Sequence, residues 1–155
     1  EDLVENVSNN QIFLNRSKIA EMGLKLDDVQ QTVINEIITY QYIDKAYSGL
    51  SMTNTSFSMG IEALVQNGYD QKRSGDVIYV YKPGVLSYGA TGSSHGTSFN
   101  YDTHVPLLMF GNGVKHGHTL KKTHITDIAP TISALLGIGF PNGATGQPLE
   151  FVLEN

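Results

Sequence analysis

The chain has 155 residues, 40% of them hydrophobic and 16% charged, and its formal net charge is −5 at pH 7. This composition is typical of a globular domain or part of one, and it excludes intrinsic disorder, collagen and coiled coil for the whole chain. The negative charge argues against a nucleic-acid-binding module, and the absence of Cys excludes disulfides, thiolate zinc sites and thiol nucleophiles.

The first half of the chain carries patterns for a hairpin, a helix and a strand. Residues 3–7 and 11–14 are short apolar-polar runs separated by a Ser-Asn-Asn turn, which predicts a hairpin or two short separate strands. Apolar residues recur on one face of residues 28–39, and two aspartates at the start suit a helix N-terminus. Residues 41–47 then predict a strand.

The middle of the chain alternates between ordered patterns and loops. The polar composition of residues 51–58 indicates a turn, while residues 56–66 predict a helix and residues 77–81 a strand rich in β-branched and aromatic side chains. Residues 88–101, which read YGATGSSHGTSFNY, hold few side chains that could pack. A loop of this length in a compact domain usually has a function.

The last third of the chain predicts one strand and one helix. Residues 105–110 read VPLLMF, which favours a strand buried on both faces of a mostly parallel sheet. Residues 126–137 predict a helix that ends at a glycine. Strands that alternate with helices indicate the α/β class. The chain has no internal repeat, and no apolar run approaches the roughly 18 residues of a membrane span.

Five histidines are the first candidates for chemistry, and most of them have ordinary explanations. His116 and His118 suit a solvated turn, and His124 suits the approach to a helix N-terminus. The chain has no G-x-S-x-G motif, its glycine-rich stretch lacks the lysine of a P-loop, and no pair of carboxylates stands out. From these patterns alone, the chain lacks a complete active site.

His95 is the exception because it lies in the long small-residue loop, directly before a glycine. Asp102 and His104 follow closely and could orient its imidazole as outer-shell partners. The alternative is a structural role, in which Asp102 accepts backbone N–H groups in a turn and His104 packs beside Pro106. A single imidazole is not a constellation, so the residues themselves leave both interpretations open.

Two motifs resemble a known family. The stretches GSSHGTSFNYDTHVPLLMFGNGV (92–114) and ITDIAPTISALLGIGFPNGATGQPL (125–149) are similar to the C-terminal part of bacterial alkaline phosphatases of the type I phosphodiesterase/nucleotide pyrophosphatase group. The second motif looks like many members of the alkaline phosphatase superfamily, and the first narrows the resemblance to that group. SNNQIFLNRSKIAEMGL (8–24) and KRSGDVIYVYKPG (72–84) also resemble it, so the similarity covers nearly the whole chain.

The resemblance implies a two-zinc hydrolase of phosphate esters that acts outside the cytoplasm, in the periplasm or as a secreted enzyme. In the family, two Zn²⁺ about 3.5–4 Å apart flank a Thr or Ser nucleophile. The last metal ligand in chain order is a His followed by Gly, and His95 takes that position. The nucleophile and the other ligands precede the matched region, so we expect no catalytic residue in this chain, and residues 1–155 to be one C-terminal fragment of a larger catalytic domain.

Two hypotheses follow from this position in the family. In the first, the chain contributes His95 and part of an α/β scaffold to a zinc-dependent phosphate-ester hydrolase. In the second, it is a non-catalytic binding or assembly module on a degenerate superfamily scaffold. Because a zinc site needs three or four ligands, both predict that the isolated chain neither holds zinc tightly nor hydrolyses phosphate esters. Strand edges and apolar surface left uncovered at residues 105–110 would favour self-association.

Overall fold

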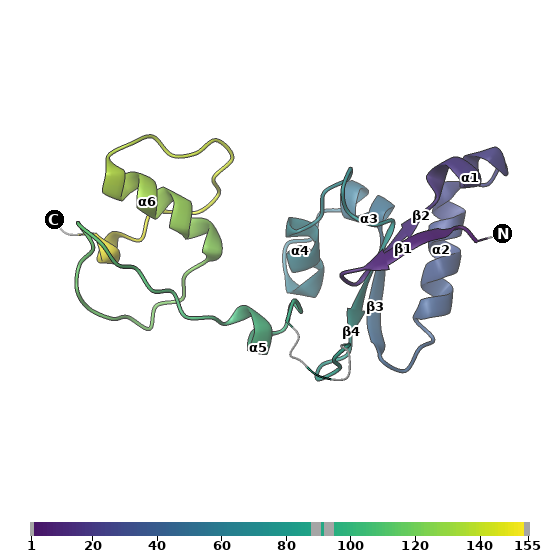
Figure 1. The fold of residues 1–155 in the computed structure, drawn as a ribbon, viewed down its shortest axis with the longest axis horizontal. Coiled ribbons are helices and arrows are strands. Elements are labelled where there is room, and N and C mark those ends of the chain that lie inside the picture. The colour runs from purple at the N-terminus through teal and green to yellow at the C-terminus, as the bar shows by residue number, and fades with distance from the viewer. Residues whose placement is uncertain (1, 88–90, 92–94, 154–155) are drawn as a thin grey trace. The chain divides into compact units, whose positions relative to one another are not determined.

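The computed structural model describes residues 2–87, 91 and 95–153, which form two compact units, Glu1–Val105 and Pro106–Asn155 (Figure 1). Residues 88–90 and 92–94 of the predicted loop lie outside the described residues. None of the helices in the described part has the length and apolarity needed to cross a bilayer.

The first unit is built on a four-stranded sheet. Its strands are β1 (Val4–Ser8), β2 (Gln11–Leu14), β3 (Ile43–Ser48) and β4 (Val77–Tyr81), in the spatial order β1-β2-β4-β3. All three neighbouring pairs are antiparallel. The strands predicted over residues 3–7, 11–14, 41–47 and 77–81 and the α/β class are confirmed, whereas the expected mostly parallel pairing is not found in this sheet. The β1–β2 hairpin explains part of the difference, because a tight turn joins antiparallel strands only.

Helices cover both faces of this sheet (Figure 1). On one face, α1 (Arg16–Glu21) and α2 (Leu26–Ile37) enclose a core of Ile12, Leu14, Ile19 and Val77. The sequence predicted α2 but not α1, because six residues are too few to show a helical period. Asn15 caps α1 by accepting a hydrogen bond from the backbone N–H of Lys18 at 2.9 Å.

The other helices of this unit are α3 (Gly49–Asn54), α4 (Gly60–Asn67) and α5 (Asn100–Thr103). The helix predicted over residues 56–66 is confirmed as α4, with a later start. The polar segment expected to form a turn is instead partly α3. Ser48 begins α3, since its hydroxyl accepts a hydrogen bond from the backbone N–H of Ser51 at 3.0 Å. That capping interaction favours a helix despite the polar composition.

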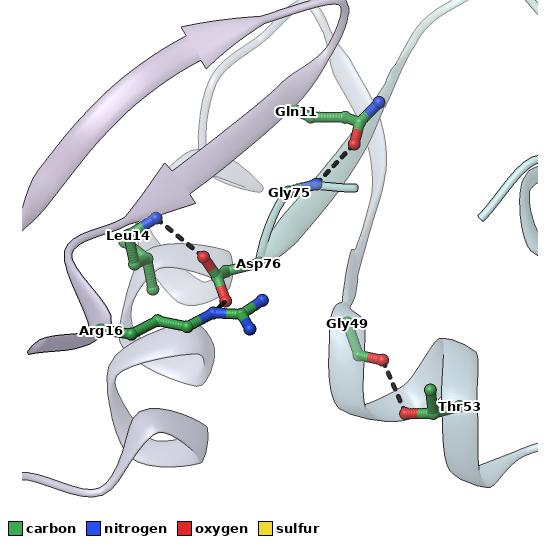
Figure 2. Close-up of polar contacts among 7 residues, drawn as sticks. All are labelled: Gln11, Leu14, Arg16, Gly49, Thr53, Gly75 and Asp76. Carbon is green, nitrogen blue, oxygen red and sulfur yellow. Dashed lines mark hydrogen bonds and ion pairs between the residues drawn. The ribbon is translucent and has the colours of Figure 1, made fainter. Parts of the chain in front are cut away.

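A buried carboxylate ties β2 to β4 (Figure 2). Asp76, which is only 2% exposed, accepts hydrogen bonds from the backbone N–H of Leu14 and from Nε of Arg16, each at 2.8 Å. Next to it, the backbone N–H of Gly75 donates to Oε1 of Gln11 at 2.6 Å. These contacts fix the position at which β4 enters the sheet.

The second unit is organised around α6 (Ile128–Leu136), preceded by the 3-10 turn η1 (Ile125–Asp127) and followed by η2 (Glu150–Val152). The predicted helix is confirmed, and it ends at Gly137 with a left-handed φ of 64°. An isolated antiparallel bridge joins Val114 to Leu153.

The buried strand predicted over residues 105–110 is not present. These residues have no regular secondary structure, and the side chain of Leu108 is 90% exposed. A strand buried on both faces needs a neighbouring strand at each edge, and no described residue pairs with this segment. The apolar run therefore lies in solvent within the described chain.

Candidate functional site

The candidate metal ligand lies at the start of a loop that ends in α5. His95 is exposed, and Gly96 after it adopts a φ of +108°, which a residue with a side chain rarely takes. Thr97 then donates two hydrogen bonds to the same oxygen of Asp102, one from its backbone N–H at 2.8 Å and one from its hydroxyl at 2.6 Å. The carboxylate closes a tight loop directly behind His95.

Aromatic side chains anchor the other end of this loop. The rings of Phe99 and Tyr101 stack with centroids 5.5 Å apart and an interplanar angle of 24°. The hydroxyl of Tyr101 accepts a hydrogen bond from the backbone N–H of Gly84 at 3.2 Å. The residues that follow Thr97 are therefore held against the segment that leaves β4.

Asp102 is ionised in this environment at neutral pH. The hydroxyl of Thr97, followed by the backbone N–H of Thr97, lowers the pKa of Asp102 below its ordinary value, and a smaller contribution comes from the charge of His95. Asp102 is half-buried and His95 is exposed. The imidazole and the carboxylate thus interact electrostatically, while the hydrogen bonds of the carboxylate go to the loop itself.

The structure places His104 at the C-terminal end of α5, exposed, with its backbone N–H bonded to the carbonyl of Asn100 at 3.0 Å. Its side chain makes no polar contact with the described residues. The sequence proposed Asp102 and His104 as equivalent outer-shell candidates, and the geometry brings only Asp102 into the loop that carries His95.

The chemistry of His95 can be compared with what a zinc site requires. Neutral imidazole is a good zinc ligand, and the exposure of His95 leaves its nitrogens accessible. The described residues contain no group of three or more His, Cys, Asp or Glu that could hold a metal ion. The described residues around His95 therefore do not by themselves make up a zinc site, which needs three or four ligands.

The same loop borders a small cavity. Gly96, Thr97 and Ser98 line a hollow of about 180 Å³ together with residues of the β1–β2 turn, α4 and β4. Among these neighbours are Asn10 and Tyr79. The loop behind His95 therefore lies beside the β1–β2 turn, α4 and β4.

The second sequence motif forms a structural joint in the second unit. Asp127 accepts hydrogen bonds from the backbone N–H groups of His124 at 2.8 Å and Gln147 at 3.0 Å, which hold its pKa below the ordinary value. Thr131 is fully buried, and its hydroxyl donates to the carbonyl of Asp127 at 2.6 Å and accepts from the N–H of Leu149 at 2.9 Å. The motif thus holds the segment before η2 against α6.

Close backbone approach explains the glycine of this joint. A Cβ at Gly146 would overlap the backbone carbonyl of Thr126, so no other residue fits without a shift of the chain. The sequence placed His124 only at the approach to a helix N-terminus, and the structure shows that it forms a capping box with Asp127 at the start of η1. His116 and His118 are exposed in a segment without regular structure.

The sequence did not identify Thr97 or Tyr101 as parts of the site. A signal was present, since Thr97 stands two residues after His95 and five before Asp102. That spacing carries no recognised motif, and only the folded loop shows that the hydroxyl and the carboxylate meet.

Comparison with known proteins finds alkaline phosphatases, in agreement with the family resemblance of the two motifs. Alkaline phosphatase PafA from Elizabethkingia meningoseptica is 38% identical over 154 residues, which are 99% of this chain and 28% of that protein. A protein named calcium-transporting ATPase from Myroides odoratus is 34% identical over 155 residues. Alkaline phosphatase PhoV from Synechococcus elongatus is 32% identical over 148 residues, which are 96% of this chain and 27% of that protein.

The fold agrees with the sequence. The crystal structure of wild-type PafA matches with a TM-score of 0.89 and 37% identity, and the match covers 99% of this chain and 30% of the other. No protein-family model matches the chain. The chain spans less than a third of the length of the curated relatives above. Sequence and fold together support placing this chain in the alkaline phosphatase superfamily, as a match to its C-terminal part.

Proposed function

We propose that this chain is the C-terminal part of a zinc-dependent phosphate-ester hydrolase of the type I phosphodiesterase/nucleotide pyrophosphatase group. The observation that supports the proposal most is the similarity to alkaline phosphatases over 99% of the chain, in both sequence and fold. The motif H-G-x5-D-T-H-V-P-L-L, which begins at His95, favours the narrower group. We also propose a periplasmic or secreted location, because the family resemblance implies one.

In this proposal His95 supplies one neutral imidazole to a site for two Zn²⁺. The bound ions would supply Lewis-acid stabilisation for the attacking and leaving oxygens of a phosphoryl group. The chain's own part is to hold the imidazole on a fixed loop, with Asp102 ionised close to it. We place the Thr or Ser nucleophile and the other metal ligands outside this chain.

The test uses the protein encoded by the complete open reading frame, with His95→Ala as the variant. We expect loss of most hydrolysis of p-nitrophenyl phosphate and a lower zinc content by elemental analysis, because an alanine cannot donate to a metal. His118→Ala is the matched control, since it removes an exposed imidazole from an irregular segment. Both readouts should stay at wild-type values in the control.

The choice of substrate is measured on the same protein. Bis(p-nitrophenyl) phosphate, p-nitrophenyl sulfate and ATP compare a diester, a sulfate ester and an anhydride with the monoester. The anhydride is included because one relative is named as an ATPase. Unchanged zinc content and rate in His95→Ala would refute the assignment of His95. A complete protein without bound zinc and without hydrolysis of any of these compounds would favour the binding-module hypothesis.

A further inference from the structure

We propose that Thr97 is a positioning residue for His95, which its hydroxyl holds in place by closing the loop onto Asp102. This inference rests on the proposed function, in which His95 is a metal ligand. The observation behind it is the pair of hydrogen bonds from Thr97 to one oxygen of Asp102, at 2.8 and 2.6 Å. We refer to this pair of contacts as the Thr97–Asp102 latch.

The latch lies one residue away from the imidazole that it positions. Only Gly96 separates His95 from Thr97, and its φ of +108° sets the direction in which His95 leaves the loop. A glycine can occupy many conformations, so it does not hold that direction by itself. The backbone N–H and the hydroxyl of Thr97 both donate to one oxygen of Asp102, so the backbone and the side chain of Thr97 are both held. This restricts the conformations that the neighbouring residues can adopt.

The two ends of the loop are held by different contacts. The end that contains α5 is anchored by the stack of Phe99 on Tyr101 and by the hydrogen bond from Gly84 to the hydroxyl of Tyr101. The end that contains His95 is tied to this anchored part through the latch. Loss of the hydroxyl of Thr97 therefore leaves the far end in place and loosens the end that carries the imidazole.

The Thr97–Asp102 latch also indicates whether Asp102 orients His95 directly or shapes the loop. Its hydrogen bonds come from the loop backbone and the hydroxyl of Thr97, and no hydrogen bond from the imidazole of His95 to Asp102 is found among the described residues. We therefore assign Asp102 to the loop geometry, with its charge as a secondary influence on His95. Thr97 and Asp102 then function as one unit, and their substitutions should not be additive.

The experiment compares Thr97→Val, Thr97→Ser and Asp102→Ala in the protein encoded by the complete open reading frame. The apoprotein is titrated with Zn²⁺ in competition with a chromophoric chelator, and its thermal unfolding is recorded in parallel. Thr97→Val keeps the size and the backbone N–H but removes the hydroxyl donor. We expect it to weaken zinc binding by about 10-fold, the lower end of the range found when outer-shell partners of metal ligands are removed, because Thr97 acts on His95 only through the loop.

Matched variants separate positioning from general damage. Thr97→Ser keeps the hydroxyl and should bind zinc nearly as tightly as the wild type. Thr103→Val makes the same chemical change at an exposed threonine of α5 whose side chain has no hydrogen bond among the described residues, and it should leave zinc affinity unchanged. The double variant Thr97→Val/Asp102→Ala should lose no more affinity than the weaker-binding single variant.

The outcomes distinguish this inference from the proposed function. A wild-type protein that binds no zinc refutes the proposed function. Tight zinc binding by the wild type, with Thr97→Val equal to Thr103→Val, overturns the inference alone. If Thr97→Val does not fold, Asp102→Ala, which removes the acceptor of both hydrogen bonds, decides in its place, and wild-type zinc affinity in that variant refutes the latch. Additive losses in the double variant would likewise show that the two residues do not act as a unit.

Discussion

The buried carboxylate of Asp76 provides the sharpest stability prediction. In the substitution Asp76→Ala, the backbone N–H of Leu14 loses its acceptor at 2.8 Å and Nε of Arg16 loses its ion-pair partner (Figure 2). Leu14 is 3% exposed, so water cannot readily replace the missing acceptor. The side chain of Arg16 is 53% exposed and can turn into solvent. The two lost contacts therefore differ in cost.

The magnitude follows from that difference. A buried donor left without an acceptor costs about 1–3 kcal/mol, while a partly exposed ion pair contributes about 0–1 kcal/mol. We expect Asp76→Ala to lower the free energy of unfolding by about 3 kcal/mol. Arg16→Gln removes only the ion pair and should cost about 1 kcal/mol or less. In Asp76→Asn, the amide oxygen can still accept from Leu14, so this variant should fall close to Arg16→Gln.

The assay is urea denaturation of the purified 155-residue chain, followed by far-UV circular dichroism. The expected order of destabilisation is Asp76→Ala first, then Asp76→Asn and Arg16→Gln together. An equal loss in Asp76→Ala and Arg16→Gln would refute the reasoning, because it would make the ion pair, rather than the buried N–H of Leu14, the stabilising contact. Equal m-values are required for this comparison.

Three further predictions concern other parts of the chain. Thr131→Val leaves the N–H of Leu149 without an acceptor and should lower the unfolding free energy by about 1–3 kcal/mol in urea denaturation, while the serine variant, which keeps the hydroxyl, should lose less. The hydrogen bond from Lys45 lowers the pKa of Glu62 from 4.5 to about 2. The ionised carboxylate therefore stabilises the fold fully above pH 4.5, and this stabilisation is lost as the pH falls toward 2. Glu62→Gln should flatten the dependence of the unfolding free energy on pH between those values, and an unchanged dependence would contradict the assignment. The exposed residues 105–110 should cause the isolated chain to self-associate at high concentration. Leu108→Lys should shift the sedimentation profile toward monomer. A wild-type chain that stays monomeric at high concentration would argue against self-association through these residues.

Much of the site depended on contacts that sequence patterns do not encode. The glycine and serine composition around His95 predicted a loop, and the H-G motif selected that histidine by resemblance. Asp102 was a candidate because it follows His95 closely in the chain. The role of Thr97 was not predictable, because a threonine in a polar loop has many equivalent partners until the backbone turns at Gly96 and brings its hydroxyl to the carboxylate.

The sequence by itself determined the elements whose signal is local. The amphipathic period of α2, the β-branched run of β4 and the terminal glycine of α6 each arise within a few residues, so neighbouring side chains suffice to specify them. Tertiary structure decided the antiparallel strand order and the exposure of residues 105–110. A strand exists only with a partner, and an apolar run does not state which segment will pair with it. Local periodicity therefore specified α2, α4, α6 and the candidate strands, and long-range pairing decided which of those strands formed.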